Sequence, residues 1–496
     1  MNKSNNLKSV GEAPDDPHHN RRWKILGFLA LAQLMVVLDA TIVNIALPSA
    51  QADLGFSDAD RQWIITAYAL AFGSLLLLGG RMSDYFGRKR ALLVGLTGFA
   101  GASALGGIAP SFEVLVGARA LQGLFGALLA PAALSTLTTT FTEPGERAKA
   151  FGVYGAVAGG GGAVGLLLGG VLTEFLDWRW CMFVNIAIAI PAAIGLRRLL
   201  AGKSELKKVS LDIPGALTAS LGLFGIVFGF SRAESEGWTA AVTLISLVAG
   251  ILLLAAFVMI ERRASAPLLP LRVVTDRNRA GSYIAVGVAG AAMFGVFLFL
   301  TYYLQQTLGF TPVETGLAFL PMIAFLMTGS VVSSTRLMPK VGPRPLVPTG
   351  MVLASLGMIW LTGVGLDSTY SSAVLPGLCL VGLGFGMIIA PSMASATLGV
   401  GAADSGVASA MVNTTQQVGG SVGTALLSTI SASAVTAFAS GKVPTADLAG
   451  QAAVHGYTTA FWVSAGMLAA GAVITAITLR SGAPRTESEG NLAMAH

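Results

Sequence analysis

Long apolar runs separated by short polar segments make up most of this chain. A run of about 20 apolar residues can cross a lipid bilayer as an α-helix. The sequence contains 14 such runs, near residues 24–48, 62–80, 91–109, 114–138, 149–172, 180–200, 212–230, 239–260, 280–303, 314–334, 345–364, 372–394, 405–434 and 456–480. The pattern predicts an all-α integral membrane protein with 14 transmembrane helices.

The composition agrees with this prediction. Of 496 residues, 54% are hydrophobic and 11% are charged, whereas soluble domains carry roughly 25% charged residues. The formal net charge of +6 could by itself indicate a nucleic-acid partner, but the charges lie between the apolar runs. We therefore expect contact with the lipid bilayer and none with nucleic acid. Cys181 and Cys379 both lie within apolar runs and are interpreted as packing residues.

The positive charges predict an orientation in the membrane. If the N-terminus is cytoplasmic, only Arg61, Arg179, Arg232 and Lys442 lie in loops on the opposite side, and Arg119 lies inside a span. The remaining 26 of the 31 Lys and Arg residues are then cytoplasmic. By the positive-inside rule, we expect a multi-pass protein of the cell membrane with both termini in the cytoplasm.

The spans show a weak internal repeat. Leu54-Gly55-Phe56-Ser57 before the second span matches Leu308-Gly309-Phe310-Thr311 before the tenth, and Gly87 matches Gly342 at nearly the same offset. Transporters are often built from such duplicated halves, and here the repeat leaves spans seven and eight unpaired. The predicted domains are a disordered cytoplasmic tail (1–22), an N-terminal six-helix bundle (23–208), an inserted two-helix hairpin (209–264), a C-terminal six-helix bundle (265–481) and a cytoplasmic tail (482–496).

Two opposite charges lie deep in the N-terminal spans. Asp39 interrupts the first apolar run, and Arg119 is the only basic residue inside a span. A charge at such depth costs ~2.5–3.5 kcal/mol and is usually paired or lines a proton path. At 1.5 Å per residue the two side chains have similar depths, so we predict that they pair. The pair is interpreted as a proton-coupling site, and a purely structural ion pair is the alternative.

Small and polar residues follow Arg119 on one helical face, namely Gln122, Gly123, Gly126 and Ala130. A second glycine face, in span 5, allows close helix approach and is interpreted as a gate, with tight packing as the alternative. Its members are Gly155, Gly159, Gly162, Gly165 and Gly169.

The loop after span 2 concentrates charge between two glycines. Acid and base together suggest a clasp on neighbouring helix ends that acts as a conformational switch, although an ordinary positive-inside loop is the alternative. Its residues are Gly80, Asp84, Gly87, Arg88, Lys89 and Arg90.

Polar residues inside other spans are candidates for a substrate cavity, because amides in mid-membrane need polar partners. For the aromatic residues at a span end, an interfacial belt is the alternative. The candidates are Asn44, Gln122, Tyr302, Gln306, Asn413, Gln416 and Gln417.

Several function classes are disfavoured. The sequence has no Walker A pattern, and its four histidines lie in tails or at a span edge, so ATP-driven transport, histidine catalysis and a metal site are not expected. A channel would need a ring of charges or a continuous polar pore. We therefore expect a secondary transporter without catalytic residues or cofactors, coupled to protons, with a small amphipathic molecule as its substrate.

The loop motif GGRMSDYFGRKRALL resembles the loop signature of the major facilitator superfamily. The six-two-six layout resembles that of its fourteen-span drug:proton antiporter group, and supporting stretches are LDATIVNIALP, RALQGLFGA, DWRWCMFVN, LTYYLQQTLGFTPVETGLAFLP and NTTQQVGGSVGTA. The resemblance implies a monomeric, proton-coupled exporter of drug-like or antibiotic molecules that works by alternating access. It also implies functional roles for Asp39 and Arg119.

The sequence departs from this pattern at three positions. Leu166 and Ile186 replace two expected prolines, and Gln416 stands where relatives usually carry arginine. The changes concern the predicted gate and cavity more than the fold.

Two alternative functions stay open. The first is export or uptake of one specific endogenous metabolite, and the weaker one is a channel.

Overall fold

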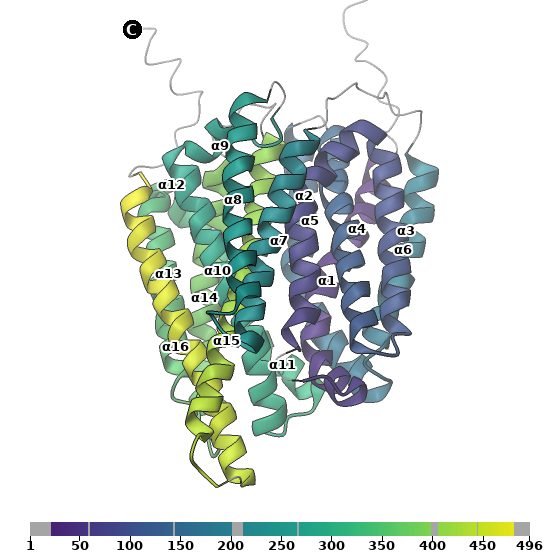
Figure 1. The fold of residues 1–496 in the computed structure, drawn as a ribbon. Helices are drawn as coiled ribbons and strands as arrows, with labels where there is room; N and C mark the ends of the chain where they lie inside the picture. Colours follow the sequence, from purple (N-terminus) through teal and green to yellow (C-terminus); the bar gives the residue numbers. More distant parts are fainter. Residues whose placement is uncertain are drawn as a thin grey trace, which may run out of the picture.

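Long helices lie side by side through the whole molecule (Figure 1). The computed structural model describes residues 21–57, 60–141, 144–200, 212–264, 267–397, 405–443 and 445–480. The helices of the first part are α1 (Arg22–Leu54), α2 (Gln62–Phe86), α3 (Arg88–Gly107), α4 (Phe112–Thr140), α5 (Pro144–Phe175), α6 (Trp180–Leu199), α7 (Ile213–Glu236) and α8 (Ala241–Arg263). The predicted terminal tails fall almost entirely outside the described residues.

The second part contains helices interrupted or extended by wider turns. Its helices are α9 (Leu271–Thr275), α10 (Arg277–Tyr302), α11 (Pro312–Val332), α12 (Met338–Val341), α13 (Pro343–Leu361), α14 (Leu375–Thr397), α15 (Ser405–Ala439) and α16 (Ala446–Thr478). Three single π-helical turns, η1 (Tyr303–Thr307), η2 (Ser333–Leu337) and η3 (Tyr370–Val374), continue α10 and α11 or lead into α14.

The prediction of a helical membrane protein is confirmed. Within the described ranges, 11 helices are long and apolar enough to cross a membrane. The other three predicted runs, 62–80, 91–109 and 149–172, correspond to α2, α3 and α5. The count of 14 spans therefore stays a prediction, although each predicted run coincides with a helix.

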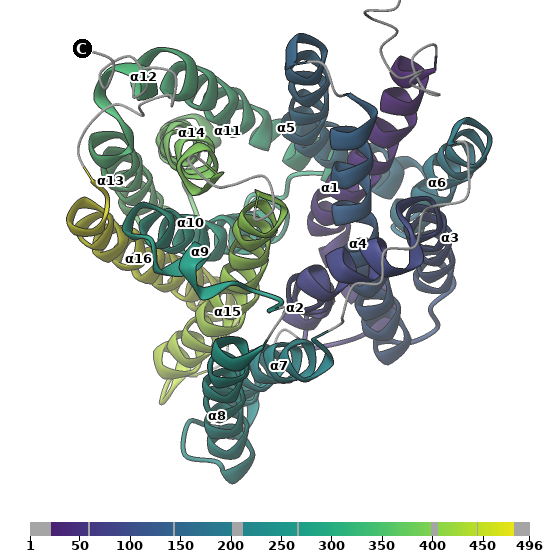
Figure 2. The same cartoon turned by 90° about the horizontal axis from the view of Figure 1, so that it is seen from above.

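The two halves of the chain use the same pattern of helix pairs (Figure 2). In the first half α4 packs on α2 and α3, α1 packs on α5 and α6, and α3 packs on α6. In the second half α14 packs on α11 and α13, α10 packs on α15 and α16, and α13 packs on α16. The repeat seen in the sequence is therefore also present in the packing.

Matching glycines turn the chain at equivalent points of this repeat. Gly55 and Gly309 have φ of +68° and +70°, and Gly87 and Gly342 have φ of +89° and +74°. A side chain at a positive φ costs energy that glycine avoids, so these positions require glycine in both halves. The sequence matches that suggested the repeat therefore reflect shared turn geometry.

Helices α7 and α8 form a pair at the edge of the molecule (Figure 2). α7 packs on α2 of the first half and on α15 of the second, and it approaches α8 closely where Gly225 faces Gly250. Small residues permit this close approach between membrane helices. The hairpin thus lies beside both halves, while the predicted domain boundaries stay predictions.

Both cysteines are free, and Cys181 is buried.

The largest hydrophobic cluster runs from the second half of α1 into α10, α11 and α14 and joins the two halves. A second cluster fills the other half of the N-terminal bundle, around α1, α3 and α4. Asp39 lies on α1 close to where these two clusters meet, so apolar packing covers it above and below along the helix.

Candidate functional site

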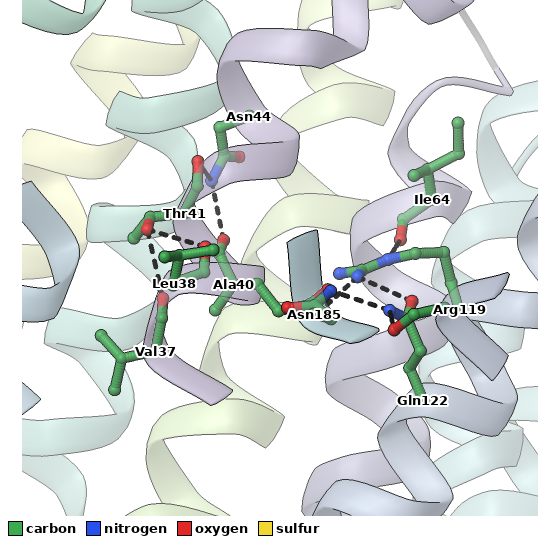
Figure 3. Close-up of polar contacts among 11 residues, drawn as sticks. Val37, Leu38, Ala40, Thr41, Asn44, Ile64, Arg119, Gln122 and Asn185 are labelled. Atoms are coloured by element: carbon green, nitrogen blue, oxygen red, sulfur yellow. Dashed lines mark hydrogen bonds and ion pairs between the residues drawn. The ribbon is translucent and has the colours of Figure 1, made fainter. Parts of the chain in front are cut away.

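Asp39 is fully buried and accepts three hydrogen bonds from three side chains. Arg119 Nη1 lies 2.6 Å from Asp39 Oδ2, Gln122 Nε2 lies 2.9 Å from Oδ1, and Asn185 Nδ2 lies 2.7 Å from Oδ1. The partners come from α4 and α6 and converge as Figure 3 shows. The carboxylate therefore has a donor for both of its oxygens, as a buried charge requires.

Arg119 has further partners besides the carboxylate. Its Nε donates to the Ile64 carbonyl oxygen at 3.0 Å, and its Nη1 donates to Gln122 Oε1 at 3.1 Å. The guanidinium also lies 4.5 Å from the centre of the Tyr68 ring, a favourable cation–π contact. The arginine is thus held by polar and aromatic groups that do not depend on the charge of Asp39.

Gln122 connects this pair to a third helix. Its Nε2 donates both to Asp39 and, at 2.8 Å, to Ser103 Oγ on α3. The five hydrogen-bonded side chains of the network are nearly inaccessible: Asp39, Ser103, Gln122 and Asn185 at 0% and Arg119 at 2% exposure. The network around this acid therefore joins five helices, α1, α2, α3, α4 and α6. Asp39 and Arg119 are level, as their positions along the spans predict.

Three members of this site were not predicted from the sequence. Asn185 interrupts the apolar stretch of span 6, and an isolated amide inside a predicted span is the signal that could have identified it. Ser103 and Tyr68 carry weaker signals, because hydroxyl groups in membrane helices commonly bond to their own backbone. Ser103 and Tyr68 contact this site because α3 and α2 pack beside α4, and the sequence alone does not show which helices are neighbours.

Asn44 lies about one turn further along α1 and does not join this network (Figure 3). Its amide nitrogen donates to the backbone oxygens of Ala40 at 3.0 Å and Thr41 at 3.4 Å. The side chain is 4% exposed. In this conformation the amide nitrogen therefore bonds to the backbone of its own helix, and the predicted role of Asn44 in a substrate cavity stays a prediction.

The glycine face of α5 packs against α1 beside Asp39. A Cβ on Gly165 would lie 2.0 Å from Thr41 Oγ1 and 3.0 Å from the Leu38 carbonyl oxygen, and one on Gly169 would lie 2.9 Å from the Ile42 carbonyl oxygen. These distances are too short for any side chain. Gly155 and Gly159 lie in the part of α5 whose surroundings are not described.

Leu166, which replaces an expected proline, lies where α5 meets α11. It is fully buried, and its carbonyl oxygen lies 2.6 Å from the position of a Cβ on Gly316. The α5 backbone is therefore continuous and helical here, in contact with the second half. Ile186, at the other departure, lies within the helix of α6.

We predict that Gly165→Ala lowers the melting temperature of the purified protein, whereas Gly162→Ala does not. The added methyl group at 165 overlaps Thr41 Oγ1, while the nearest atom to a Cβ on Gly162 is 3.9 Å away. Overpacking of this kind costs about 1–3 kcal/mol. Thermal unfolding in detergent measures the effect, and equal melting temperatures for both variants would contradict the packing described.

The two halves are joined on the predicted outer side, where α1 and α10 end. Tyr302 Oη donates to Gln51 Oε1 at 2.5 Å, and the Arg61 guanidinium lies 4.1 Å from the centre of the Tyr302 ring. Gln305 Nε2 donates to the Ile45 carbonyl oxygen at 3.2 Å. Tyr302, a predicted cavity residue, is fully buried in this junction.

The other predicted cavity residues lie on different helices of the second half. Gln306 Oε1 accepts from Tyr457 Oη at 3.4 Å on α16. Asn413, Gln416 and Gln417 are half-buried on α15, where the Gln416 backbone faces α10 and Gln417 faces Gly73 of α2. None of the hydrogen bonds described for the Asp39 network involves these residues, and a role in binding substrate stays a proposal.

The charged loop joins α2 to α3 around Gly87. Lys89 Nζ donates to the Leu200 carbonyl oxygen at 2.5 Å, and Arg81 Nη2 donates to the Pro267 carbonyl oxygen at 2.6 Å. Arg88 is half-buried, and Gly80 faces Pro131 of α4. Lys89 and Arg81 therefore bind the backbone of other segments, whereas Arg90 is exposed. The Asp84 side chain is outside the described part.

Comparison with known proteins gives relatives along nearly the whole chain. The model of the Major Facilitator Superfamily matches residues 29–424. Puromycin resistance protein pur8 of Streptomyces alboniger is 50% identical over 94% of this chain and 93% of its own length. Cephamycin export protein CmcT of Amycolatopsis lactamdurans is 40% identical over 81% of this chain and 83% of its own.

Solved structures share the fold at low sequence identity. A crystal structure of an auto-inhibited POT family peptide transporter has a TM-score of 0.66 and 14% identity, covering 92% of this chain and 96% of its own. A bacterial homologue of the human lysosomal transporter Spinster, in an inward-facing and unoccupied conformation, has a TM-score of 0.63 and 14% identity, covering 94% of this chain and 98% of its own. With the family match over most of its length, this chain belongs to the major facilitator superfamily and is a membrane transporter rather than an enzyme.

Proposed function

We propose that this protein exports amphipathic antibiotics or drug-like molecules across the cell membrane in exchange for protons. The observation that carries the proposal is the buried Asp39, whose carboxylate is shared by Arg119, Gln122 and Asn185. A titratable group at such depth is expensive and is commonly part of an ion or proton path. Relatives of this chain are named for antibiotic resistance and export.

The geometry around Asp39 suits a group that alternates between charged and neutral forms. When Asp39 binds a proton, Arg119 retains the Ile64 carbonyl oxygen, Gln122 Oε1 and the Tyr68 ring. The arginine can therefore stay charged and partnered while the acid is neutral. We propose that Asp39 carries the coupling proton and that Arg119 modulates its binding.

We propose further that the conformation described is closed toward the outside. The Tyr302–Gln51 hydrogen bond and the Arg61–Tyr302 contact lie between the two halves at the predicted outer ends of α1 and α10. In alternating access the two halves rock about a central binding site, so contacts of this kind break when the outer side opens.

We propose in addition that the chain crosses the membrane 14 times and that the α7–α8 hairpin lies at the periphery of the two bundles.

The substrate class follows from the residues available in mid-membrane and from the relatives. The predicted cavity residues are amides and aromatics rather than charges, which favours amphipathic molecules over sugars or phosphates. Several relatives are named for one compound, such as puromycin, cephamycin or tetracenomycin C, whereas LfrA is named a multidrug efflux pump. Export of a single compound is therefore the second candidate.

Drug uptake into inverted membrane vesicles tests the proposal. We expect vesicles that contain this protein to accumulate labelled puromycin when energised, and to lose the accumulated label when a protonophore is added. Unlabelled compounds of other classes, added as competitors, distinguish a broad substrate range from a single substrate. Accumulation that requires ATP and resists the protonophore would contradict proton-coupled export.

The predicted orientation gives a separate test with cysteine variants. Ser204→Cys lies in the predicted cytoplasmic segment between spans six and seven, and Val443→Cys lies between α15 and α16, where the native residue is 81% exposed. On a background without native cysteines, a membrane-impermeant maleimide should label Val443→Cys in intact cells. It should label Ser204→Cys only after permeabilisation, and the reverse pattern would overturn the orientation.

A further inference from the structure

A second buried acid lies away from Asp39, at the end of the hairpin where α7 begins and α8 ends. Glu261 on α8 is only 4% exposed, and its Oε2 accepts a hydrogen bond from the Leu269 backbone N–H at 3.0 Å. Asp212 caps α7, with Oδ1 accepting from the Gly215 backbone N–H at 2.9 Å. Each carboxyl group thus uses one oxygen to fix the backbone.

The two remaining carboxyl oxygens lie close to one another, and neither has a donor among the described residues. Asp212 Oδ2 and Glu261 Oε1 are both buried and have no hydrogen-bond partner among the described residues. A Cβ on Gly215 would lie 2.4 Å from the first and 2.9 Å from the second, so both oxygens border one small space. The two carboxyl groups are therefore close neighbours at this point. Two carboxylates are both acceptors, so this contact requires a proton on one of them.

Among the described residues, the neighbouring basic groups do not supply the missing donor. The described basic residues on the elements at this end of the hairpin are Arg81 on α2, Arg262 and Arg263 on α8, and Arg272 on α9, while Arg232 of α7 lies at its opposite end beside Glu236. Arg81 donates to the Pro267 carbonyl oxygen, and the other three side chains at this end are exposed. Within the described residues, neither acid forms an ion pair.

We propose that Asp212 and Glu261 form a second proton-binding site, in which one proton is shared between Asp212 Oδ2 and Glu261 Oε1. Two negative charges at this buried contact would repel each other, so the proton stabilises the folded arrangement. The site also fixes a junction, because Glu261 holds Leu269 while Arg81 of α2 holds Pro267 in the same connecting segment. Loss of the proton would loosen the hairpin from the segment that leads into α10.

Thermal unfolding of the purified full-length protein at different pH values tests this site. Glu261→Gln replaces the shared proton with an amide that donates to Asp212, so the contact is kept without a titrating group. We expect the melting temperature of the wild type to fall relative to that of Glu261→Gln as the pH is raised from about 6 to about 9. A constant difference between the two proteins would overturn the proposal.

Infrared spectroscopy adds a readout that identifies the proton directly. The wild type should show the carbonyl band of a protonated carboxyl group, and the band should lose intensity in both Asp212→Asn and Glu261→Gln. Gly215→Ala leaves both acids in place but inserts a methyl group between them, and it should also remove this intensity. If all three variants keep the full band, no proton is shared here.

A matched control is Glu236→Gln, which neutralises an exposed acid at the opposite end of α7. This variant should keep both the pH dependence of the melting temperature and the infrared band of the wild type. The same two measurements in Asp39→Asn should still detect the Asp212–Glu261 proton. Because none of these measurements uses transport, the result is independent of whether the protein exports drugs. Loss of the signal in Glu236→Gln would contradict its assignment to this pair.

Discussion

Asp39→Asn should abolish export driven by a pH gradient while the protein still folds. Asparagine has nearly the shape of a protonated aspartate, and Arg119 keeps the Ile64 carbonyl oxygen, Gln122 Oε1 and the Tyr68 ring as partners. Asn185 Oδ1 has no hydrogen-bond partner among the described residues, so the Asn185 amide can turn and accept from the new amide nitrogen. We therefore expect the site to tolerate a neutral residue at position 39. A residue that cannot gain or lose a proton cannot exchange protons for substrate.

Puromycin accumulation in inverted vesicles with an imposed pH gradient measures this effect. We expect accumulation by Asp39→Asn to fall to the level of vesicles without the protein, with the melting temperature in detergent showing that the variant is folded. Glu113→Gln, which changes the exposed acid at the start of α4, is the control and should accumulate like the wild type. Full gradient-driven accumulation by Asp39→Asn would contradict a role of Asp39 in proton coupling, and the Asp39–Arg119 pair would then have only a structural role.

Arg119→Ala should have the larger effect on stability. It removes the cation that balances the Asp39 charge and leaves the carboxylate with two amide donors, from Gln122 and Asn185. Breaking a buried ion pair by removing one partner typically costs about 3–5 kcal/mol. We therefore expect a large fall in melting temperature. In any folded fraction the acid should bind a proton more readily, and the pH dependence of transport should shift to higher pH.

The double variant Asp39→Asn/Arg119→Ala distinguishes charge imbalance from lost packing. If an unpaired Asp39 charge is the cause, the double variant should be more stable than Arg119→Ala alone, although it should not transport. Thermal unfolding of the four proteins, with wild type and both single variants, gives the coupling between the two positions. A double variant no more stable than Arg119→Ala would show that the arginine acts through packing.

Much of the site could be predicted because charges in lipid have few permitted surroundings. Asp39 and Arg119 are a single acid and a single base at similar depth, and each lowers the cost of burying the other. The 2.6 Å contact between them follows from that constraint. The helical fold was predictable for the same kind of reason, since backbone groups in lipid must bond within their own segment.

The neutral partners could not be predicted in the same way. Asn185 and Ser103 reach the site only because α6 and α3 pack beside α1 and α4. These helices are apolar nearly all round, so the sequence pattern does not say which face meets which neighbour. Asn44 illustrates the difficulty, because its amide bonds to the backbone of its own helix. The π turns of the second half likewise have no simple sequence signal.

Proton movement in proteoliposomes tests the central claim most directly. Purified protein is reconstituted with a pH-sensitive dye inside the vesicles, and a puromycin gradient is imposed without a pH gradient. Proton-coupled export through Asp39 predicts that puromycin flow in one direction drives protons in the other for the wild type, and that Asp39→Asn moves no protons. Puromycin transport by the wild type without proton movement, or equal proton movement by Asp39→Asn, would contradict it.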